Sequence, residues 1–320
     1  MGARIGKRLE FLMKVLAAAE PLSLQVHPSR DQAEEGYLRE QASGVPLGSS
    51  HRNYKDAHAK SEMIVALRDG FEALCGFRPL VQVDSLLGEI AERVPDRSPV
   101  DRWRAVVVDE GLEAAVTWLL SGEPMVERVL HGLRIALVEP PSGLAAMKTV
   151  IERYPSDSGA ALSLMLNHVV LAAGEALWLA AGTPHAYLSG VGIELVGPSD
   201  NVLRGGLTAK HVDVPELLSV LQHKAGPPAF LVPEPEGAYV KAYMPASHPS
   251  GRDIDFWLRE VTGDAQIRTS GPAIILVLDG EFRIIFGDEV ETVRRGESVF
   301  CPDAGTVAFG GSGRSFIAAT

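Results

Sequence analysis

The sequence predicts a mainly β fold with an α-helical insertion, and three stretches of the 320-residue chain support this. Residues 174–196 show short alternating apolar runs bounded by glycine and proline, which are typical of half-buried strands. From Pro79 to about Leu166 the apolar spacing changes to three and four, which is typical of amphipathic helices. Residues 238–320 return to short strands and turns. The chain is therefore expected to hold two β units, the first interrupted by helices.

Composition and charge limit the possible partners. A hydrophobic content of 46% supports sizeable cores, and the length allows two or three domains. A net charge of -11 disfavours nucleic acid and anionic membranes, because the field of the protein would repel phosphates. No sequence stretch approaches the roughly 18 apolar residues of a membrane span. Cys75 and Cys301 are too few and too far apart for a disulfide framework, which indicates a reducing cytoplasm.

Most of the candidate chemistry falls in residues 174–213. Glycine and proline just before His185 predict a tight turn that delivers this histidine onto the following strand. His185 and Tyr187 then share one face, because side chains alternate along a strand. A return strand over residues 192–196 is expected to place Glu194 beside them. The stretch therefore predicts an imidazole, a phenol and an acid in one place.

A polar loop at residues 198–201 leads into Arg204 and two glycines, which let a ligand approach the guanidinium closely. Loops of this composition often serve sites. Two alternatives stay open for the single residues, a hydrogen-bonded core histidine at His185 and a solvated cation at Arg204. Their occurrence in one stretch favours a site.

The spacing of a Gly-Glu turn, an Ala-Ala-Gly turn and His185 resembles the second motif of the cupin β-barrels, where the histidine is a metal ligand. Upstream, Gln25 and His27 lie two apart in a predicted strand, so an amide oxygen and an imidazole can approach one ion. Glu62 opens the strand-like run EMIVAL and adds a carboxylate. Two nitrogen and two oxygen ligands suit Zn²⁺ with a position open for substrate.

Over roughly residues 8–222 the chain resembles the type I mannose-6-phosphate isomerases, or phosphomannose isomerases. The similarity is carried by FLMKVLAAAEPLSLQVHPS, NYKDAHAKSEMIVAL, FEALCGFRPL, AGTPHAYLSG and SDNVLRGGLTAKHVDVPELL. It implies two tandem cupin (jelly-roll) β-barrels and one zinc ion per chain. It also implies a small sugar phosphate as partner and interconversion of mannose 6-phosphate and fructose 6-phosphate through an enediol(ate). We expect a cytoplasmic monomer.

The resemblance assigns roles to individual positions. The implied metal ligands are Gln25, His27, Glu62 and His185; the candidate catalytic residues are Arg204, Glu194 and Lys210; and the candidate substrate-binding residues are Ser23, Lys60 and Tyr187. Glu194 is our first choice for the proton-transfer base, because a partly buried carboxylate near a metal can be poised for transfer. Lys210 is the rival base, and Arg204 would stabilise developing negative charge.

Two departures from the family pattern are visible. Ser61 stands where proline is usual, which should loosen the backbone without changing the ligand. Family members carry several dozen residues before the segment matching FLMKVL, so we expect a shortened N-terminus and an exposed strand edge.

The predicted domains follow these patterns. They are a catalytic, N-terminally shortened barrel at 1–78 and 167–222, a helical insertion at 79–166, a linker at 223–237 and a cupin-like β domain at 238–320. In that last domain Ala308 falls where the metal-binding histidine would stand, so we expect a structural role.

Several alternatives remain at this stage. His51 and His58 are tempting ligands, but we expect solvated loop histidines. A noncatalytic sugar-binding cupin would bind ligand without turnover and would not need Arg204. A cupin oxygenase would use Fe²⁺ with a His-rich first motif, and Gln25 argues against it.

Overall fold

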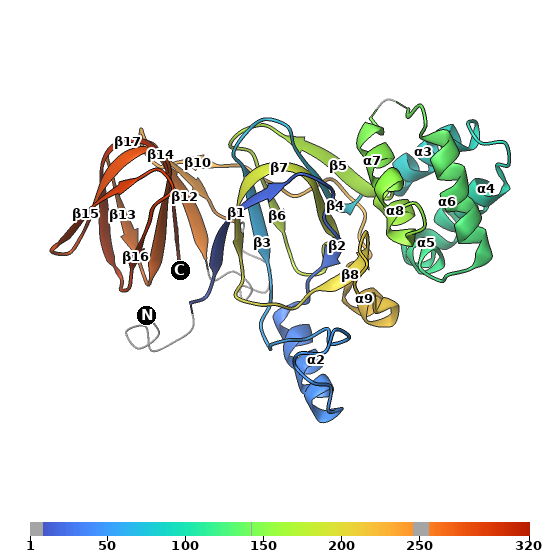
Figure 1. Cartoon of the computed structure of the whole chain (residues 1–320), viewed down its shortest axis with the longest axis horizontal. Helices are drawn as coiled ribbons and strands as arrows, with labels where there is room; N and C mark the ends of the chain where they lie inside the picture. Colours follow the sequence, from blue (N-terminus) through green and yellow to red (C-terminus); the bar gives the residue numbers. More distant parts are fainter. Residues whose placement is uncertain (1–8, 142, 246–255) are drawn as a thin grey trace.

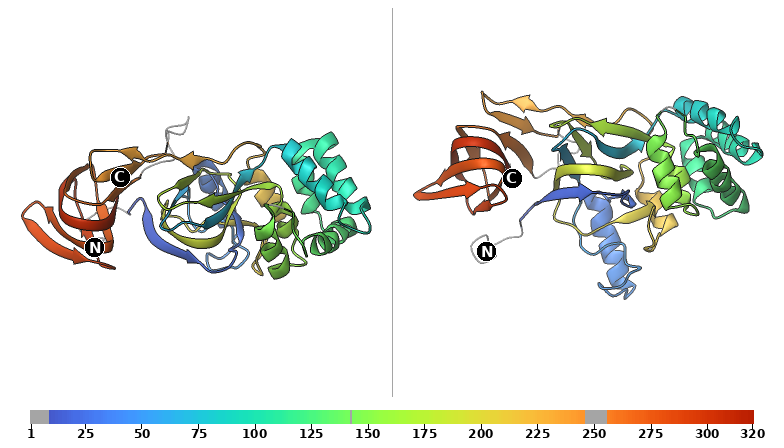
Figure 2. Two further views of the ribbon diagram at one scale, coloured as in Figure 1. Left: turned by 90° about the horizontal axis from the view of Figure 1, so that it is seen from above. Right: turned by 45° about the horizontal axis from the view of Figure 1, so that its top comes forward.

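The computed structural model of the chain describes residues 9–141, 143–245 and 256–320. A β unit lies in the middle, with a helical unit at one end and a second β unit at the other (Figure 1). The same arrangement is visible from two further directions (Figure 2). The predicted domain boundaries also include residues 1–8, 142 and 246–255, which lie outside the described residues. The mainly β fold with helices inserted into its first part is confirmed.

The middle unit is built around β7 (His185–Val196), a 12-residue strand that pairs antiparallel with four neighbours. These neighbours are β1 (Leu12–Ala18), β2 (Leu24–Val26), β3 (Glu62–Ala66) and β4 (Phe71–Phe77). The other described strands of this sheet are β5 (Leu166–Leu171), β6 (Ala176–Leu179), β8 (Leu203–Gly206) and β9 (Phe230–Leu231). Two helices flank it, α2 (Arg30–Ala42) and α9 (Val214–Val220). Elements far apart in sequence therefore meet along one central strand.

The course of β7 differs from the prediction. We expected a return strand over residues 192–196, but β7 continues without a reversal. Gly190, with φ of 115°, and an irregular register opposite β4 interrupt the alternation of side chains midway along the strand. Tyr187 before this point and Glu194 after it consequently line the same cavity, although strict alternation would send them to opposite faces.

Strand β3 is buried on both faces. Ile64 and Ala66 belong to the apolar interior of the middle unit. Met63 and Val65 point the other way, into an apolar cluster shared with the second β unit. Because Glu62 has the same parity as Ile64, its carboxylate points into the interior.

The helices lie in the predicted insertion. They are α3 (Leu80–Ala91), α4 (Ser98–Ala105), the π-helical segment η1 (Val106–Glu110), α5 (Gly111–Leu119), α6 (Pro124–Ala136), α7 (Ala145–Arg153) and α8 (Ser158–Ser163). Their apolar faces form a core that continues onto the middle unit through Leu24, Leu74 and Leu203. The helical unit therefore covers the outside of β2, β4 and β8. Among the described residues, no helix is long and apolar enough to span a membrane.

The second β unit is an antiparallel sheet in which β14 and β17 are the longest strands and pair along most of their length. Its strands are β10 (Glu234–Pro235), β11 (Val240–Tyr243), β12 (Trp257–Val261), β13 (Ala265–Thr269), β14 (Ala273–Phe286), β15 (Glu289–Arg294), β16 (Ser298–Cys301) and β17 (Gly305–Ala319). The predicted linker at 223–237 contains β9 and β10, which extend the first and second sheets respectively. This segment thus joins both sheets, because its extended backbone finds open strand edges on each side.

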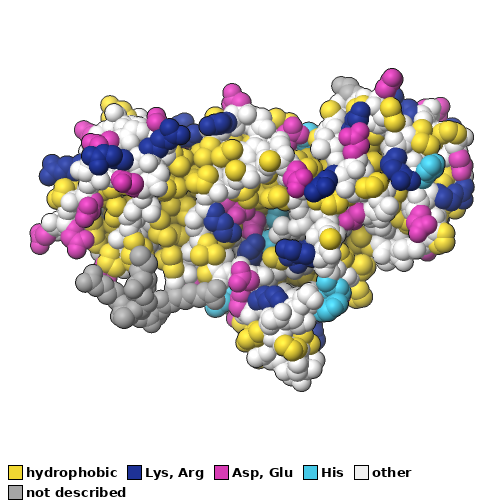
Figure 3. All heavy atoms as spheres, in the orientation of Figure 1, with side chains coloured by type: hydrophobic (Ala, Val, Ile, Leu, Met, Phe, Trp, Pro, Cys, Tyr) yellow, Lys and Arg dark blue, Asp and Glu magenta, His cyan; other side chains and the backbone are white. Residues whose placement is uncertain are grey.

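Polar and apolar contacts join the two β units. The Tyr243 hydroxyl donates to the Gly174 carbonyl at 3.0 Å, and Arg314 Nη1 donates to the Leu67 carbonyl at 2.9 Å. Hydrophobic side chains gather over this junction on the face shown in Figure 3. On β1, Leu12 is 42% exposed and Val15 is 50% exposed.

Gly190→Ala is expected to lower the thermal midpoint by several degrees. Its φ strains any L residue, and a new Cβ would lie 2.8 Å from the Cα of Phe71, a combined cost on the order of 2 kcal/mol. The control is Gly48→Ala, at an exposed position with no heavy atom within 4 Å of the added carbon, which should melt like the parent protein. Equal midpoints for both variants, measured by calorimetry, would show that the bend of β7 does not require glycine.

Candidate metal centre

Three side chains from separate elements meet inside the middle unit. His27 Nε2 lies 3.1 Å from Glu62 Oε1, and His185 Nε2 lies 3.3 Å from Glu62 Oε2. All three side chains are buried, and their candidate ligand atoms lie within 4.8 Å of one another. A carboxylate held between two imidazoles is a donor set that binds divalent metals.

Strand register brings Gln25 to the same place. Gln25 on β2 pairs with His185 on β7 and also with Arg204 on β8. Side chains of directly paired residues lie on one face of a sheet, so these three form a row across it. Gln25 Nε2 donates to Ser23 Oγ at 3.0 Å, which leaves the amide oxygen of Gln25 available as a ligand.

Backbone carbonyls orient both imidazole rings. Nδ1 of His27 lies 2.8 Å from the Asn201 carbonyl oxygen, and Nδ1 of His185 lies 3.0 Å from that of Thr183. Because a carbonyl can only accept, each Nδ1 carries a hydrogen, and Nε2, which faces Glu62, is the nitrogen of each ring that can serve as a ligand. Burial also lowers the pKa of His27 to about 4, so this ring is neutral at neutral pH. Both rings are therefore arranged as ligands.

Lys60 supplies positive charge to the cluster. Its Nζ lies 2.5 Å from Glu62 Oε1 and 3.2 Å from His27 Nε2. Burial alone would raise the pKa of Glu62, but the neighbouring His27 and Lys60 hold it well below its usual range. The carboxylate is therefore ionised and in contact with a cation. Two imidazole nitrogens, this carboxylate and the Gln25 oxygen make up a chemical set that fits zinc.

A cavity of about 170 Å³ adjoins the cluster. Its lining includes the metal-ligand candidates Gln25, Glu62 and His185, with Ser23, Lys60, Tyr187, Glu194 and Lys14 around them. The structure thus brings together most of the predicted site residues. The cavity combines charged groups of both signs with hydroxyl groups, which suits a polar small molecule.

Glu194 and Tyr187 occupy this cavity in unusual electrostatic surroundings. Burial and the charge of Glu62 raise the pKa of Glu194, while Lys14, whose Nζ lies 3.3 Å from Glu194 Oε2, opposes the shift. Burial, with the charges of Glu62 and Glu194, raises the pKa of Tyr187 well above its usual value. Tyr187 is therefore a neutral phenol, and Glu194 is a carboxylate of increased basicity.

Two of the predicted catalytic residues lie outside the lining of this cavity. Arg204 is half-buried beside Gln25, burial lowers its pKa, and its Nε is buried without a hydrogen-bond partner among the described residues. Lys210 is exposed in the segment after β8. His51 and His58 are exposed, as expected for solvated loop histidines.

The sequence analysis missed the contributions of Lys14 and Asn201. Lys14 pairs with Glu194 across β1 and β7, and its only sequence signal is a charge within an apolar strand pattern. Asn201 is fully buried, and its carbonyl orients His27. The polar loop around it was noticed, but its contact with a residue 174 positions earlier has no local signal.

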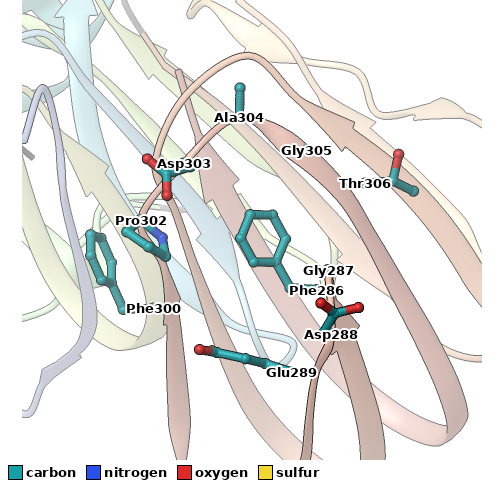
Figure 4. A pocket seen from close by; sticks show the side chains of 10 residues that line it. All are labelled: Phe286, Gly287, Asp288, Glu289, Phe300, Pro302, Asp303, Ala304, Gly305 and Thr306. Atoms are coloured by element: carbon teal, nitrogen blue, oxygen red, sulfur yellow. The ribbon is translucent and has the colours of Figure 1, made fainter. Parts of the chain in front are cut away.

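A larger cavity of about 960 Å³ lies in the second β unit (Figure 4). Its lining includes two phenylalanines, Phe286 and Phe300, and three carboxylates, those of Asp288, Glu289 and Asp303. Among the described residues, no basic side chain and no histidine belongs to this lining, so its carboxylates would repel a phosphorylated ligand. The smaller cavity beside His185 is therefore the better candidate site, despite its size.

Comparisons with known proteins agree with the geometry. A family profile described as phosphomannose isomerase type I, catalytic domain, matches residues 1–80. The mannose-6-phosphate isomerase of Escherichia coli K12 is 36% identical over 309 residues, covering 94% of this chain and 76% of that protein. A crystal structure of zinc-bound mannose 6-phosphate isomerase aligns with a TM-score of 0.86 at 34% identity, covering 100% of this chain and 80% of the other. A variant of phosphomannose isomerase from Salmonella typhimurium aligns with a TM-score of 0.86 at 33% identity, again covering 100% and 80%.

His185→Ala is expected to abolish stoichiometric zinc binding, because it removes one of two nitrogen ligands from a buried cluster. Zinc per chain after dialysis against a mild chelator is the measurement. His58→Ala, an exposed histidine outside the cluster, is the matched control and should keep one zinc per chain. Full zinc content in the His185 variant would refute the ligand assignment.

Proposed function

This chain belongs to the type I phosphomannose isomerase family, and on that basis we propose that it interconverts mannose 6-phosphate and fructose 6-phosphate with one bound zinc ion. The observation that carries the proposal is the buried cluster of His27, Glu62 and His185 beside a polar cavity. Relatives named for this activity match nearly the whole chain.

The zinc ligands are Gln25, His27, Glu62 and His185. Bound there, zinc supplies a Lewis acid that polarises carbonyl and hydroxyl oxygens of a sugar. The low pKa of His27 supports its role, because a neutral ring can bind metal without first losing a proton. The amide nitrogen of Gln25 donates a hydrogen bond to Ser23 Oγ, so the amide oxygen of Gln25 serves as a neutral ligand.

The reaction moves a proton between neighbouring carbons. A base takes the proton from carbon 2 of the aldose, an enediol(ate) forms, and the proton returns to carbon 1 to give the ketose. In the same sequence a hydroxyl proton passes from the oxygen on carbon 2 to the oxygen on carbon 1. Glu194 is the base, because it lines the cavity and its raised pKa strengthens it as a proton acceptor. The exposed position of Lys210, the rival base, favours Glu194 further.

Other side chains bind and orient the sugar phosphate. Ser23 and Tyr187 offer hydroxyl groups to the cavity, and Tyr187 donates because its phenol stays protonated. Lys60 offers an ammonium group that already contacts Glu62. Arg204 stabilises negative charge on the reacting oxygens, which is supported by its unpaired buried Nε and its place beside Gln25.

We place this activity in the reducing cytoplasm, because Cys75 and Cys301 are both free and buried, and we expect the protein to act as a monomer. The catalytic barrel comprises residues 1–78 and 167–222. The helical insertion at 79–166 covers one end of this barrel, and residues 238–320 form a structural domain.

A coupled isomerase assay on the parent protein and Arg204→Ala tests the function. We expect turnover in the parent protein and a fall in kcat on the order of 10²-fold in the variant, because a fixed cation beside a developing oxyanion acts mainly in the transition state. KM should change little, and zinc should stay stoichiometric. Absence of turnover in a zinc-loaded parent protein would support a sugar-binding protein instead. A normal kcat with a greatly raised KM would make Arg204 a phosphate clamp.

Glu194→Gln should lower kcat by about 10² to 10⁴-fold with zinc retained, because the amide keeps the shape of the side chain but cannot accept the carbon proton. Glu291→Gln, an exposed position in the second β unit, is the matched control and should keep full activity. Activity of the Glu194 variant above a tenth of the parent value would transfer the role of base to another group.

A further inference from the structure

Asn201 lies where two chain segments face each other beside the metal cluster. It is fully buried, with 0% of its surface exposed. One segment is the polar loop at 199–201, and the other is residues 55–58, which precede β3 with residues 59–61 in between. Its hydrogen bonds with described residues join these two segments to each other and to His27.

The backbone of Asn201 holds His27. The Asn201 carbonyl oxygen lies 2.8 Å from His27 Nδ1 and accepts its hydrogen. This contact selects the tautomer that presents Nε2 to Glu62, and it also sets the rotation of the ring. The orientation of the imidazole therefore depends on where the Asn201 backbone is held.

The side chain of Asn201 holds the facing segment. Its Oδ1 accepts from the backbone N–H groups of Lys55 at 2.7 Å and Asp56 at 3.2 Å. Its Nδ2 donates to the carbonyl oxygens of Asp56 at 2.8 Å and His58 at 3.1 Å. Two donors face one end of the amide and two acceptors face the other, so only one orientation satisfies all four groups.

Residues 55–58 also bind the 199–201 loop, through the side chain of Asp56. The Asp56 carboxylate accepts from Ser199 Oγ at 2.8 Å and from the Asp200 backbone N–H at 2.9 Å. Ser199 Oγ in turn accepts from the Asn201 backbone N–H at 3.1 Å. The two segments are thus joined by a closed polar network in which Asn201 is the central member.

This network connects the groups that hold zinc in the proposed function. Residues 55–58 lead into Lys60 and Glu62, and the Gly197 N–H donates to the Ser61 carbonyl at 2.9 Å. A shift of Asn201 would therefore move the ring of His27 and the start of β3 together. We propose that Asn201 is a positioning residue that sets the relative placement of His27 and Glu62, and thereby the affinity of the site for zinc. This inference rests on the proposed zinc-dependent function.

Zinc affinity and the visible spectrum of the Co²⁺-substituted protein test the inference in Asn201→Ala and Asn201→Asp. Alanine leaves four backbone groups without partners, and aspartate turns an acceptor towards two carbonyl oxygens. Both variants should bind zinc about 10- to 100-fold more weakly, measured by competition with a chromophoric chelator. The cobalt absorption should change in energy and intensity, because it reports ligand geometry and a loss of stability alone would leave it unaltered.

Asn53→Ala is the matched control. The Asn53 side chain lies two positions before Lys55 but donates to Asp213 Oδ2 at 2.7 Å, which takes no part in the hydrogen bonds of Asn201 described above. Its zinc affinity and cobalt spectrum should match those of the parent protein. An equal loss in this variant, or unchanged zinc affinity in folded Asn201 variants, would overturn the inference.

Ser199→Ala keeps the test decisive if both Asn201 variants fail to fold. It removes the hydroxyl between Asp56 and the Asn201 backbone but leaves the amide in place. A zinc affinity at least about threefold weaker supports the inference, and an unchanged affinity overturns it. Failure of the proposed function would appear separately, as a parent protein that binds no stoichiometric zinc, and it would remove this inference as well.

Discussion

The negative charge of Glu62 is buried, and the middle of the structure is arranged to compensate for its loss of hydration. Glu62 is 2% exposed, and its carboxylate contacts the ammonium group of Lys60. An isolated buried carboxylate would be strongly unfavourable, so the contact with Lys60 stabilises the fold in this region. A zinc ion among the same atoms would compensate the same charge. Compensation of the buried negative charge of Glu62 therefore accounts for the neighbouring lysine, and the same charge makes the cluster a cation site.

The second β unit contributes to this burial, and none of its described residues belongs to the candidate metal cluster. Its Leu258 and Phe316 pack in the apolar cluster that covers Met63 and Val65, on the back of the strand that carries Glu62. The position expected for a metal-binding histidine in this unit is Ala308, within β17. A barrel that lacks metal ligands can still lower the dielectric around a metal site by covering its supporting strand.

The central strand connects the candidate ligand His185 to Glu194, the residue that we propose as the base. His185 begins β7, and Glu194 lies near its other end, where it pairs with Lys14. Both side chains reach one cavity because the alternation of the strand is interrupted near Gly190. A regular strand would place the side chains of His185 and Glu194 on opposite faces, so the irregularity is needed to bring both to the cavity.

Local patterns in the sequence determine much of this protein. Alternating and helical periodicities predict the β units and the inserted helices, because burial of one face requires those periods. The separation of Gln25 and His27 by two residues, and the place of Glu62 at the start of a strand, identify the metal-binding candidates for the same reason. The predicted return strand at 192–196 was wrong, because β7 continues through a register irregularity instead of reversing. No local pattern in the sequence distinguishes such an irregularity from a turn. The strands within the predicted linker were missed, because they exist only where other strands offer open edges.

Only the tertiary structure decides which groups meet. The contact of His27 with Asn201 and that of Lys14 with Glu194 join residues 174 and 180 positions apart. Such contacts depend on the register between strands and on loops packed against each other, and one-dimensional periodicity contains neither. The types of the ligands follow from short-range spacing, whereas their orientation and electrostatic surroundings arise from long-range pairing.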